Sequence, residues 1–395
     1  QNAGGVGAEI EDMASGQRHR ITADYLVGCD GAASLVRRSL GIQLAGQGTI
    51  GYPINMFFRA PGLLAQSGRK PGTFFIPVDR DGVWGNLRVI DPAKDVWRLM
   101  VDSANDVTPE SVDRDGYLRR ALGRDVAVEW IDVNVWRRRS LVAERYGDGR
   151  VLLAGDAVHQ LSPTGALGMN SGVGDAVDLG WKLAAVLQGW GGARLIDSYD
   201  SERRPIGERN VGMATNFHKG NEAFSHWSPA LDDNGPAGDR SRRDLGEMLE
   251  RKIGAEFRTL GLQIGYAYES SPICMSDGTP APADDPANYI ADARPGARAP
   301  HVWIDDNQST LDLFGQGFVL LRFAGAPDTA ALTAAAAARQ VPLTTIDIDR
   351  PDAAEIYGRS LVLVRPDGHV AWRADDVPAD SGALIDRVRG AETPH

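Results

Sequence analysis

The residues of this 395-residue chain that are best suited to chemistry lie between Val151 and Asn170. The apolar run from Arg150 to Ala154 is short and bounded by turn residues, which is typical of a buried strand. Gly155 and Asp156 follow it directly. The strand therefore delivers a carboxylate to the edge of a sheet, where the carboxylate can accept hydrogen bonds from hydroxyl groups.

The second part of this segment is a glycine-punctuated loop that leads into a predicted helix. Apolar residues recur with helical spacing from Ser171 to Leu187. The first backbone N–H groups of a helix lack internal partners, and the helix dipole adds about half a positive charge there. Glycines allow a ligand to approach this backbone closely. The candidate binding residues in the loop are Pro163, Gly165, Gly168, Met169 and Asn170.

These features together suit a flavin. A ribityl hydroxyl could bind Asp156, and the pyrimidine edge of a reduced, anionic ring would be favoured at the helix N-terminus. An upstream segment, from Ile21 to Gly41, repeats the order of strand, Asp-Gly and helix.

The two segments closely resemble the paired motifs of the FAD-dependent aromatic hydroxylases, which are single-component flavoprotein monooxygenases. Asp30-Gly31, with Ser34 and Arg37, stands where that family carries its DG motif, and Gly155-Asp156 stands where it carries its GD motif. The run from Tyr199 to Pro205 is also similar to the family, and we expect it to have a structural role.

The resemblance implies an activity. In this family NADPH or NADH reduces FAD once a phenol is bound, and O2 then forms a flavin C4a-hydroperoxide. The distal oxygen of that group attacks the ring next to its hydroxyl. Such a site must exclude water, because the hydroperoxide otherwise decays to hydrogen peroxide. We therefore expect a monooxygenase with FAD and NADPH or NADH as cofactors, acting on a small aromatic substrate and O2.

The resemblance also assigns roles to the motif residues. Asp156 would hold the ribityl chain, residues 168–170 would face the pyrimidine edge, and Pro163 would border the reacting carbon. Asp30 and Arg37 would brace the second side of the cofactor. The base that deprotonates the phenol stays unassigned, because its position relative to the substrate must be known first.

The chain has no phosphate-binding G-x-G-x-x-G turn in a suitable context, although a flavin domain of this class should open with one. The match at Gly46–Gly51 precedes a strand-like run instead of a helix, so we interpret it as a loop. We expect either a fragment or a protein that has lost its pyrophosphate site. Two alternatives follow: a polyketide-tailoring flavin oxygenase, or a non-catalytic fragment or interaction module that does not retain FAD.

The predicted fold is mixed α/β, with a partial Rossmann-like FAD domain that carries two insertions or extensions. The expected parts are the first FAD segment (1–45), an antiparallel substrate-binding sheet (46–140), the second FAD segment (141–215), a helical segment with linker (216–295) and a thioredoxin-like domain (296–395). The last lacks a C-x-x-C motif, so we expect it to serve packing and a possible homodimer contact. Four aromatic residues could contact the substrate, although we favour a core role for each: Phe74, Phe75, Trp84 and Trp97.

Composition excludes some partners. The net charge of −11 argues against a nucleic-acid or anionic-membrane surface, because those partners require clustered Lys and Arg. No apolar run has transmembrane length and no signal peptide is recognisable, so the cytoplasm is the expected location. Two cysteines cannot build a disulfide framework, and the scattered histidines predict no metal site. For His159 a structural role is favoured over a flavin contact.

Overall fold

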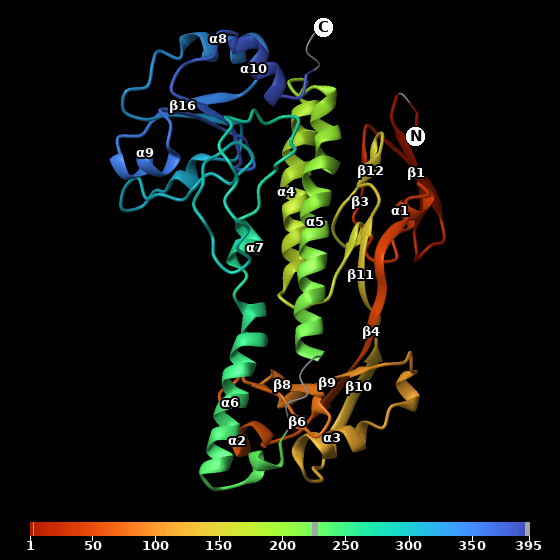
Figure 1. Ribbon diagram of the computed structural model, residues 1–395. Coiled ribbons are helices and arrows are strands. Elements are labelled where there is room, and N and C mark those ends of the chain that lie inside the picture. Colours follow the sequence, from red (N-terminus) through yellow and green to blue (C-terminus); the bar gives the residue numbers. More distant parts are fainter. Residues whose placement is uncertain (3, 223–227, 392–395) are drawn as a thin grey trace.

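The computed structural model describes residues 1–2, 4–222 and 228–391 (Figure 1). Two long helices form its centre, α4 (Leu167–Leu187) and α5 (Ala193–Glu222). A mainly antiparallel sheet lies at one end of this helix pair, and a separate α/β unit packs beside the other end (Figure 1). Among the described residues, no helix is long and apolar enough to cross a membrane.

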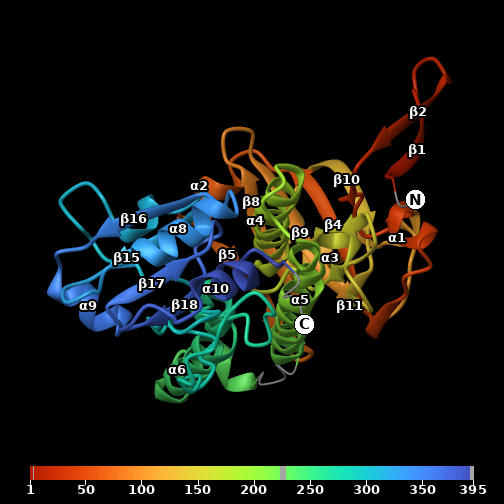
Figure 2. The ribbon, with the colours of Figure 1, turned by 90° about the horizontal axis from the view of Figure 1, so that it is seen from above.

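The two motif segments lie side by side although more than a hundred residues separate them. Strand β3 (Leu26–Gly28) pairs in parallel with β13 (Val151–Leu153), and β12 (Gly147–Asp148) adds an antiparallel edge. Helix α1 (Leu35–Ser39) follows β3. Because parallel strands end at the same edge of a sheet, Asp30 and Asp156 both follow that edge. Strands β1 (Val6–Glu11) and β2 (Arg18–Ala23) form an antiparallel hairpin that projects from the molecule (Figure 2).

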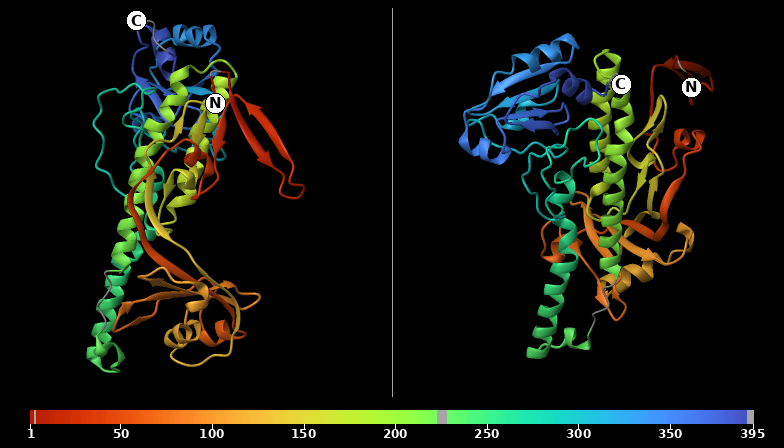
Figure 3. Two further views of the ribbon diagram at one scale, coloured as in Figure 1. Left: turned by 90° about the vertical axis from the view of Figure 1, so that its right-hand side faces the viewer. Right: turned by 45° about the horizontal axis from the view of Figure 1, so that its top comes forward.

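Strand β4 (Leu44–Arg59) runs from the flavin part into the second sheet (Figure 3). Gly46–Gly51, which we interpreted as a loop, lies within this strand, and that interpretation was wrong. Gly46 has φ 142°, and a Cβ there would overlap the carbonyl oxygen of Ser140 on the neighbouring strand β11 (Arg138–Ala143). The register between β4 and β11 shifts at this point, so the glycine serves a β-bulge.

The large sheet has the strand order β14-β11-β4-β9-β8-β5, with β10 also paired to β4. Positions 45/46 and 140/141, where we divided the chain, fall inside β4 and β11. Two short strands form a separate pair, β6 (Val78–Asp79) and β7 (Gly82–Val83). The remaining strands are β5 (Phe74–Phe75), β8 (Gly85–Asp91), β9 (Val96–Ser103), β10 (Glu129–Val135) and β14 (His159–Gln160).

The helical segment is built from two long helices. Helix α5 continues through Pro205 to Glu222, and α6 (Pro236–Lys252) follows it. Residues 223–227 lie outside the described part of the chain. Helices α2 (Leu63–Ser67) and α3 (Arg114–Leu122), which the sequence did not indicate, pack near the large sheet. The short turn η4 (Gly254–Phe257) and helix α7 (Leu260–Ile264) follow α6.

The C-terminal unit has the strand order β16-β15-β17-β18, with β15 and β16 parallel and the other pairs antiparallel. This is the thioredoxin-like order that the sequence predicts. The strands are β15 (Phe318–Arg322), β16 (Leu343–Asp347), β17 (Leu361–Val364) and β18 (Val370–Ala374). Its helices are α8 (Ala330–Ala338), α9 (Pro351–Tyr357) and α10 (Ser381–Val388).

The C-terminal unit is joined to the central helices by apolar and ionic contacts. Phe318 of β15 packs edge-on against Trp181 of α4. Beside this contact, the buried guanidinium of Arg365 binds Asp178 of α4 at 3.0 Å and Glu202 of α5 at 2.6 Å. The run from Tyr199 to Pro205 therefore has the structural role that we expected.

Candidate active site

Five of the predicted binding residues line one cavity of about 970 Å³. The cavity lies where the parallel strands end, between the turn that follows β13 and the start of α4. Its predicted members are Asp156, Pro163, Gly168, Met169 and Asn170. Ala32 and Ala33, which follow the Asp-Gly motif, also line it.

Helix α4 begins at Leu167, four residues before the predicted start at Ser171. Ala166 adopts a left-handed conformation, with φ 55°, and separates the preceding loop from the helix. Gly168, Met169 and Asn170 therefore form the first turn of α4, where backbone N–H groups lack internal partners. The predicted start was too late because Gly and Asn are weak helix formers, so helical spacing becomes visible only after them.

Asp156 is an exposed carboxylate of this cavity. It lies in the turn η2 (Gly155–Ala157), and its side chain forms no hydrogen bond or ion pair with another described residue. Gly155 has φ 63°, a conformation that favours glycine. The carboxylate is therefore available to hydroxyl groups of a ligand.

Asp30 and Arg37 do not line this cavity but support its surroundings. The carboxylate of Asp30 accepts hydrogen bonds from the N–H groups of Leu35 at 2.6 Å and Val36 at 3.1 Å, at the start of α1. Burial alone would raise the pKa of Asp30, but the hydrogen bonds from Ser34 and these amides outweigh it and lower the pKa. Gly31 turns the chain before this helix with φ 78°.

Arg37 connects the two motifs. Its guanidinium is buried and donates a hydrogen bond of 2.8 Å to the carbonyl oxygen of Ala157. Arg37 therefore holds the last residue of the turn that carries Asp156. Arg37 thus affects the first cavity indirectly, because it holds the turn that carries Asp156.

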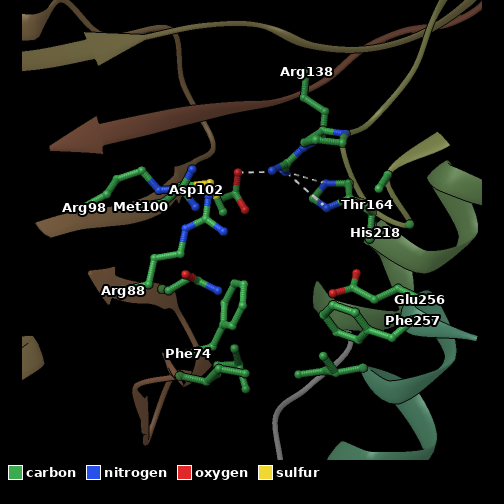
Figure 4. Close-up of a pocket in the computed structure, with 18 of the residues that line it drawn as sticks. Phe74, Arg88, Arg98, Met100, Asp102, Arg138, Thr164, His218, Glu256 and Phe257 are labelled. Atoms are coloured by element: carbon green, nitrogen blue, oxygen red, sulfur yellow. Dashed lines mark hydrogen bonds and ion pairs between the residues drawn. The ribbon is translucent and has the colours of Figure 1, made fainter. Parts of the chain in front are cut away.

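A second cavity, of about 940 Å³, lies over the large sheet (Figure 4). The two cavities share lining residues, namely Trp136, Leu161, Pro163 and Ala166. Gly165 also lines the second cavity, where a Cβ would lie 3.2 Å from the ring of Phe217. The loop between β14 and α4 therefore separates two spaces of ligand size.

Aromatic side chains line much of the second cavity. Phe74 and Trp84 face it, as do Trp136 and Phe257. Trp97 is instead 1% exposed and belongs to the core of the sheet, and Phe75 packs against that core. Of the four aromatic candidates, Phe74 is thus a cavity residue, and Trp84 both lines the cavity and packs against the core. Phe75 and Trp97 have the core role that we favoured.

Two arginines on the sheet face the same cavity without acidic partners. Arg88 of β8 and Arg98 of β9 are opposite one another in the ladder, and no described acidic residue forms an ion pair with either. Burial, with a smaller contribution from the charge of Arg88, lowers the pKa of Arg98 to about 10. The buried Nε atoms of both residues have no hydrogen-bond partner among the described residues.

Sequence reasoning missed this pair, although a signal was present. In β8 the buried residues Leu87 and Val89 alternate with Asn86 and Arg88. A strand that is polar on one face normally turns that face to water. Here the polar face of β8 lines a cavity instead, which the sequence pattern of the strand cannot show.

A third arginine lies where the second cavity meets the helices. Arg138 is 3% exposed, donates a hydrogen bond of 2.8 Å to Asp102 and lies 3.1 Å from the ring nitrogens of His218 (Figure 4). The sequence indicated none of these three residues as a site residue. The structure thus adds a polar group near Thr164 of the shared loop.

The first cavity suits the FAD that the resemblance implies. The exposed Asp156 carboxylate can accept hydroxyl donors, and the first turn of α4 presents free N–H groups to an electron-rich edge. Met169 is 79% exposed at this turn and offers an apolar surface to a ring. These residues therefore fit the ribityl chain and the pyrimidine edge of a flavin.

Family models match most of the chain. The FAD binding domain matches residues 1–214, and the C-terminal domain of aromatic-ring hydroxylases matches residues 292–391. The FAD-dependent monooxygenase apdD of Emericella nidulans is 32% identical over 98% of this chain and 67% of its own length. The aklavinone 12-hydroxylase RdmE of Streptomyces purpurascens is 34% identical over 93% of this chain and 67% of its own length.

Solved structures agree with these matches. The rebeccamycin biosynthetic enzyme RebC with reduced flavin superposes with a TM-score of 0.88 at 40% identity, covering 99% of this chain and 73% of RebC. The flavin-dependent monooxygenase PieE, in complex with FAD and substrate, gives a TM-score of 0.85 at 32% identity over 98% of this chain and 74% of PieE. The motifs, the fold and these matches agree that the chain belongs to the FAD-dependent aromatic-ring hydroxylases, the family of FAD-dependent monooxygenases and polyketide hydroxylases.

Proposed function

We propose that the protein oxygenates a large, planar aromatic substrate that carries an anionic group, with electrons from NADPH or NADH. The observation that carries this proposal is the pair of adjoining cavities. The first holds the flavin-binding features, and the second is lined by aromatic residues and by two arginines that form no ion pair with a described residue. Because the two share Trp136 and the loop at Pro163, a flavin ring and an aromatic substrate would meet there.

The motif residues would hold the cofactor as follows. Asp156 would bind the ribityl hydroxyls, and the N–H groups of residues 168–170 would face the pyrimidine edge. When bound, FAD accepts electrons from the nicotinamide and activates O2 for transfer of one oxygen atom. Pro163 and Trp136 would keep water from the space where the two ligands meet, which protects the reactive state.

The arginine pair supports the proposal of an anionic substrate. Two guanidinium groups face each other across β8 and β9 in a half-buried cavity, where they lose part of their hydration. An anionic group such as a carboxylate would relieve their mutual repulsion and accept their hydrogen bonds. The rings of Phe74 and Trp84 would then stack against the aromatic part of the substrate.

Relatives are consistent with such a ligand. One structure of RebC, at 40% identity and a TM-score of 0.88, was soaked with chromopyrrolic acid and contains bound 7-carboxy-K252c. Another relative, an aklavinone-11 hydroxylase, was solved with FAD and aklavinone at 31% identity and a TM-score of 0.77. Both ligand names support a large substrate for this chain, and the first also supports an acidic one.

The test is oxygen incorporation under 18O2. The purified protein, loaded with FAD, is incubated with NADPH or NADH and a panel of polycyclic aromatic carboxylates and matched neutral esters. We expect a carboxylate to accelerate nicotinamide oxidation and its product to carry one atom of 18O. A product without 18O would contradict the proposal, because its new oxygen atom would come from water. Equal rates of nicotinamide oxidation with and without every aromatic compound would also contradict it.

A further inference from the structure

The position of the Gly155–Ala157 turn depends on one buried carboxylate of helix α4. Asp175 is 1% exposed and accepts three hydrogen bonds from three different elements. Its Oδ2 accepts from the N–H of Gly155 at 3.0 Å and from Nε2 of His159 at 2.8 Å. Its Oδ1 accepts from Nε of Arg203 on α5 at 2.9 Å.

The backbone around Asp175 brings these groups close together. A Cβ at Gly172, one turn before Asp175, would lie 3.4 Å from the Cα of Gly155, so helix and turn touch through glycine. A Cβ at Gly174 would lie 2.6 Å from the guanidinium of Arg203. The contacts of Asp175 therefore require small residues beside it along α4.

Asp175 is held in its charged form by these partners. Burial alone would raise the pKa of its carboxyl, but the hydrogen bond from His159 and the charge of Arg203 outweigh burial and lower that pKa. A carboxylate can accept all three hydrogen bonds, whereas a neutral amide has one oxygen and must turn its NH2 group toward at least one donor. An amide at this position therefore cannot accept hydrogen bonds from Gly155, His159 and Arg203 at the same time.

The turn is held at both of its ends. Asp175 binds the N–H of Gly155 at the first residue, and Arg37 binds the carbonyl oxygen of Ala157 at the last. Asp156 lies between these two points and has no side-chain partner among the described residues. The direction of its carboxylate is therefore set by the backbone of the turn.

We propose that Asp175 is a positioning residue for the cofactor: through Gly155 it fixes the turn that presents Asp156 to the ribityl chain. The inference rests on the proposed function, because it needs the flavin to lie in the cavity that Asp156 lines. It goes beyond that function because Asp175, which does not line the cavity, would contribute to the affinity for FAD.

The experiment measures the Kd for FAD by flavin fluorescence, together with the melting temperature, for wild type, Asp175→Asn and the matched control Asp178→Asn. Asp178 lies one helical turn further along α4, is equally buried and binds Lys182 and Arg365 rather than the turn. We expect Asp175→Asn to weaken FAD binding about tenfold, the effect of losing one charge-assisted hydrogen bond. Asp178→Asn should lower the melting temperature at least as much and change the Kd less than about threefold.

A double-mutant cycle separates positioning from general destabilisation. If Asp175 acts through Asp156, then Asp175→Asn should have almost no further effect on the Kd in an Asp156→Asn background. Additive losses, or equal Kd changes in Asp175→Asn and Asp178→Asn, would overturn the inference. Should Asp175→Asn show no cooperative melting, His159→Leu takes its place in the cycle, since it keeps the carboxylate and removes one of its donors.

The outcomes for the two proposals differ. Wild-type protein that binds no FAD would end the proposed function and this inference together. Wild-type protein that binds FAD, with Asp175→Asn and His159→Leu both leaving the Kd unchanged, would end this inference alone.

Discussion

Single residues of the site fall into two groups, those that would touch ligands and those that hold the first group in place. Asp156 and Met169 are exposed in the first cavity, and Arg98 faces the second. Asp30 and Arg37 are used instead for the start of α1 and for the Gly155–Ala157 turn. The family motifs therefore contain both residues that would contact ligands and residues that hold those residues in place. Only the geometry of the structure distinguishes the two kinds.

Replacing Arg98 by Met should raise the KM for an aromatic carboxylate about tenfold to a hundredfold, with a smaller change in kcat. The reason is the loss of one charge-assisted hydrogen bond, worth about 1.5–3 kcal/mol, that binds substrate and transition state alike. Steady-state kinetics measure the effect. Arg59→Met is the control, because Arg59 belongs to the same sheet, binds Glu129 and does not line the cavity.

The charge of Arg98 also gives substrate binding a pH dependence. The pKa of Arg98 in the free protein is lowered to about 10, so the guanidinium is charged below that pH and loses its proton above it. The affinity for an anionic ligand should therefore be steady from neutral pH upward and should fall as the pH rises through about 10. Equilibrium titrations with a neutral ester should show no such fall, and a parallel fall for the ester would argue against the assignment.

Among the elements, helix α4 gives the site its central support. Its first turn lines the first cavity, Asp175 binds the turn of Asp156, and Asp178 binds Arg365 of the C-terminal unit. Its glycines have different environments. Gly174 faces the guanidinium of Arg203, whereas Gly180 is exposed and a Cβ added there would meet no described atom within 4 Å.

The two glycines should therefore respond in opposite ways to alanine. Gly180→Ala should raise the free energy of unfolding by about 0.5–1 kcal/mol, because alanine loses less backbone entropy in a helix. Gly174→Ala should lower it by about 1–3 kcal/mol, because the new Cβ would lie 2.6 Å from Arg203 and force a shift. Denaturant unfolding of both variants measures this, and a stabilised Gly174→Ala would refute the close contact of α4 with α5.

Much of this architecture could be predicted from the sequence, and the failures have local causes. The strands before Asp30 and Asp156 and the thioredoxin-like unit are visible because short apolar runs end at turn residues. The start of α4 was misplaced in part because the left-handed Ala166 carries no sequence signal. Arg88 and Arg98 were missed because strand alternation shows which face is polar but not whether a cavity covers that face.

Across the molecule, buried charges join the C-terminal unit to the helices that carry the flavin motifs. The cluster consists of Asp178, Lys182, Glu202, Arg365 and Asp367, all at most 1% exposed. Each acidic group accepts hydrogen bonds from a buried cation, so removing one cation leaves a buried charge without compensation. The unit therefore contributes to stability although it lacks redox cysteines.

Arg365→Ala should lower the free energy of unfolding by about 3–5 kcal/mol, since it deprives the buried Glu202 and Asp367 of a shared partner. Arg322→Ala should cost less than about 1 kcal/mol, because its contact with Asp347 is largely exposed. Chemical denaturation of both variants makes the comparison. Equal losses would show that the cluster does not hold the unit in place.

The same cluster predicts sensitivity to acid. Burial alone would raise the pKa values of Asp367 and Glu202, but the charge of Arg365 outweighs it and lowers both. Their contribution to stability is therefore complete above the ordinary carboxyl pKa of about 4 and is lost as the pH falls below it. Thermal melting from neutral pH to about pH 3 should show a steep fall below about pH 4. A melting temperature that is constant over that range would contradict these assignments.

The visible absorption spectrum of the protein, recorded after incubation with FAD and desalting and then during titration with a polycyclic aromatic carboxylate, tests whether the two cavities bring cofactor and substrate together. We expect flavin to be retained at near-equal stoichiometry, and its bands to shift with saturation as the aromatic ring fills the adjoining cavity. The corresponding neutral ester should shift the bands only at much higher concentration. A colourless protein, or a retained flavin whose spectrum no aromatic acid alters, would show that the cavities do not bind the two ligands side by side.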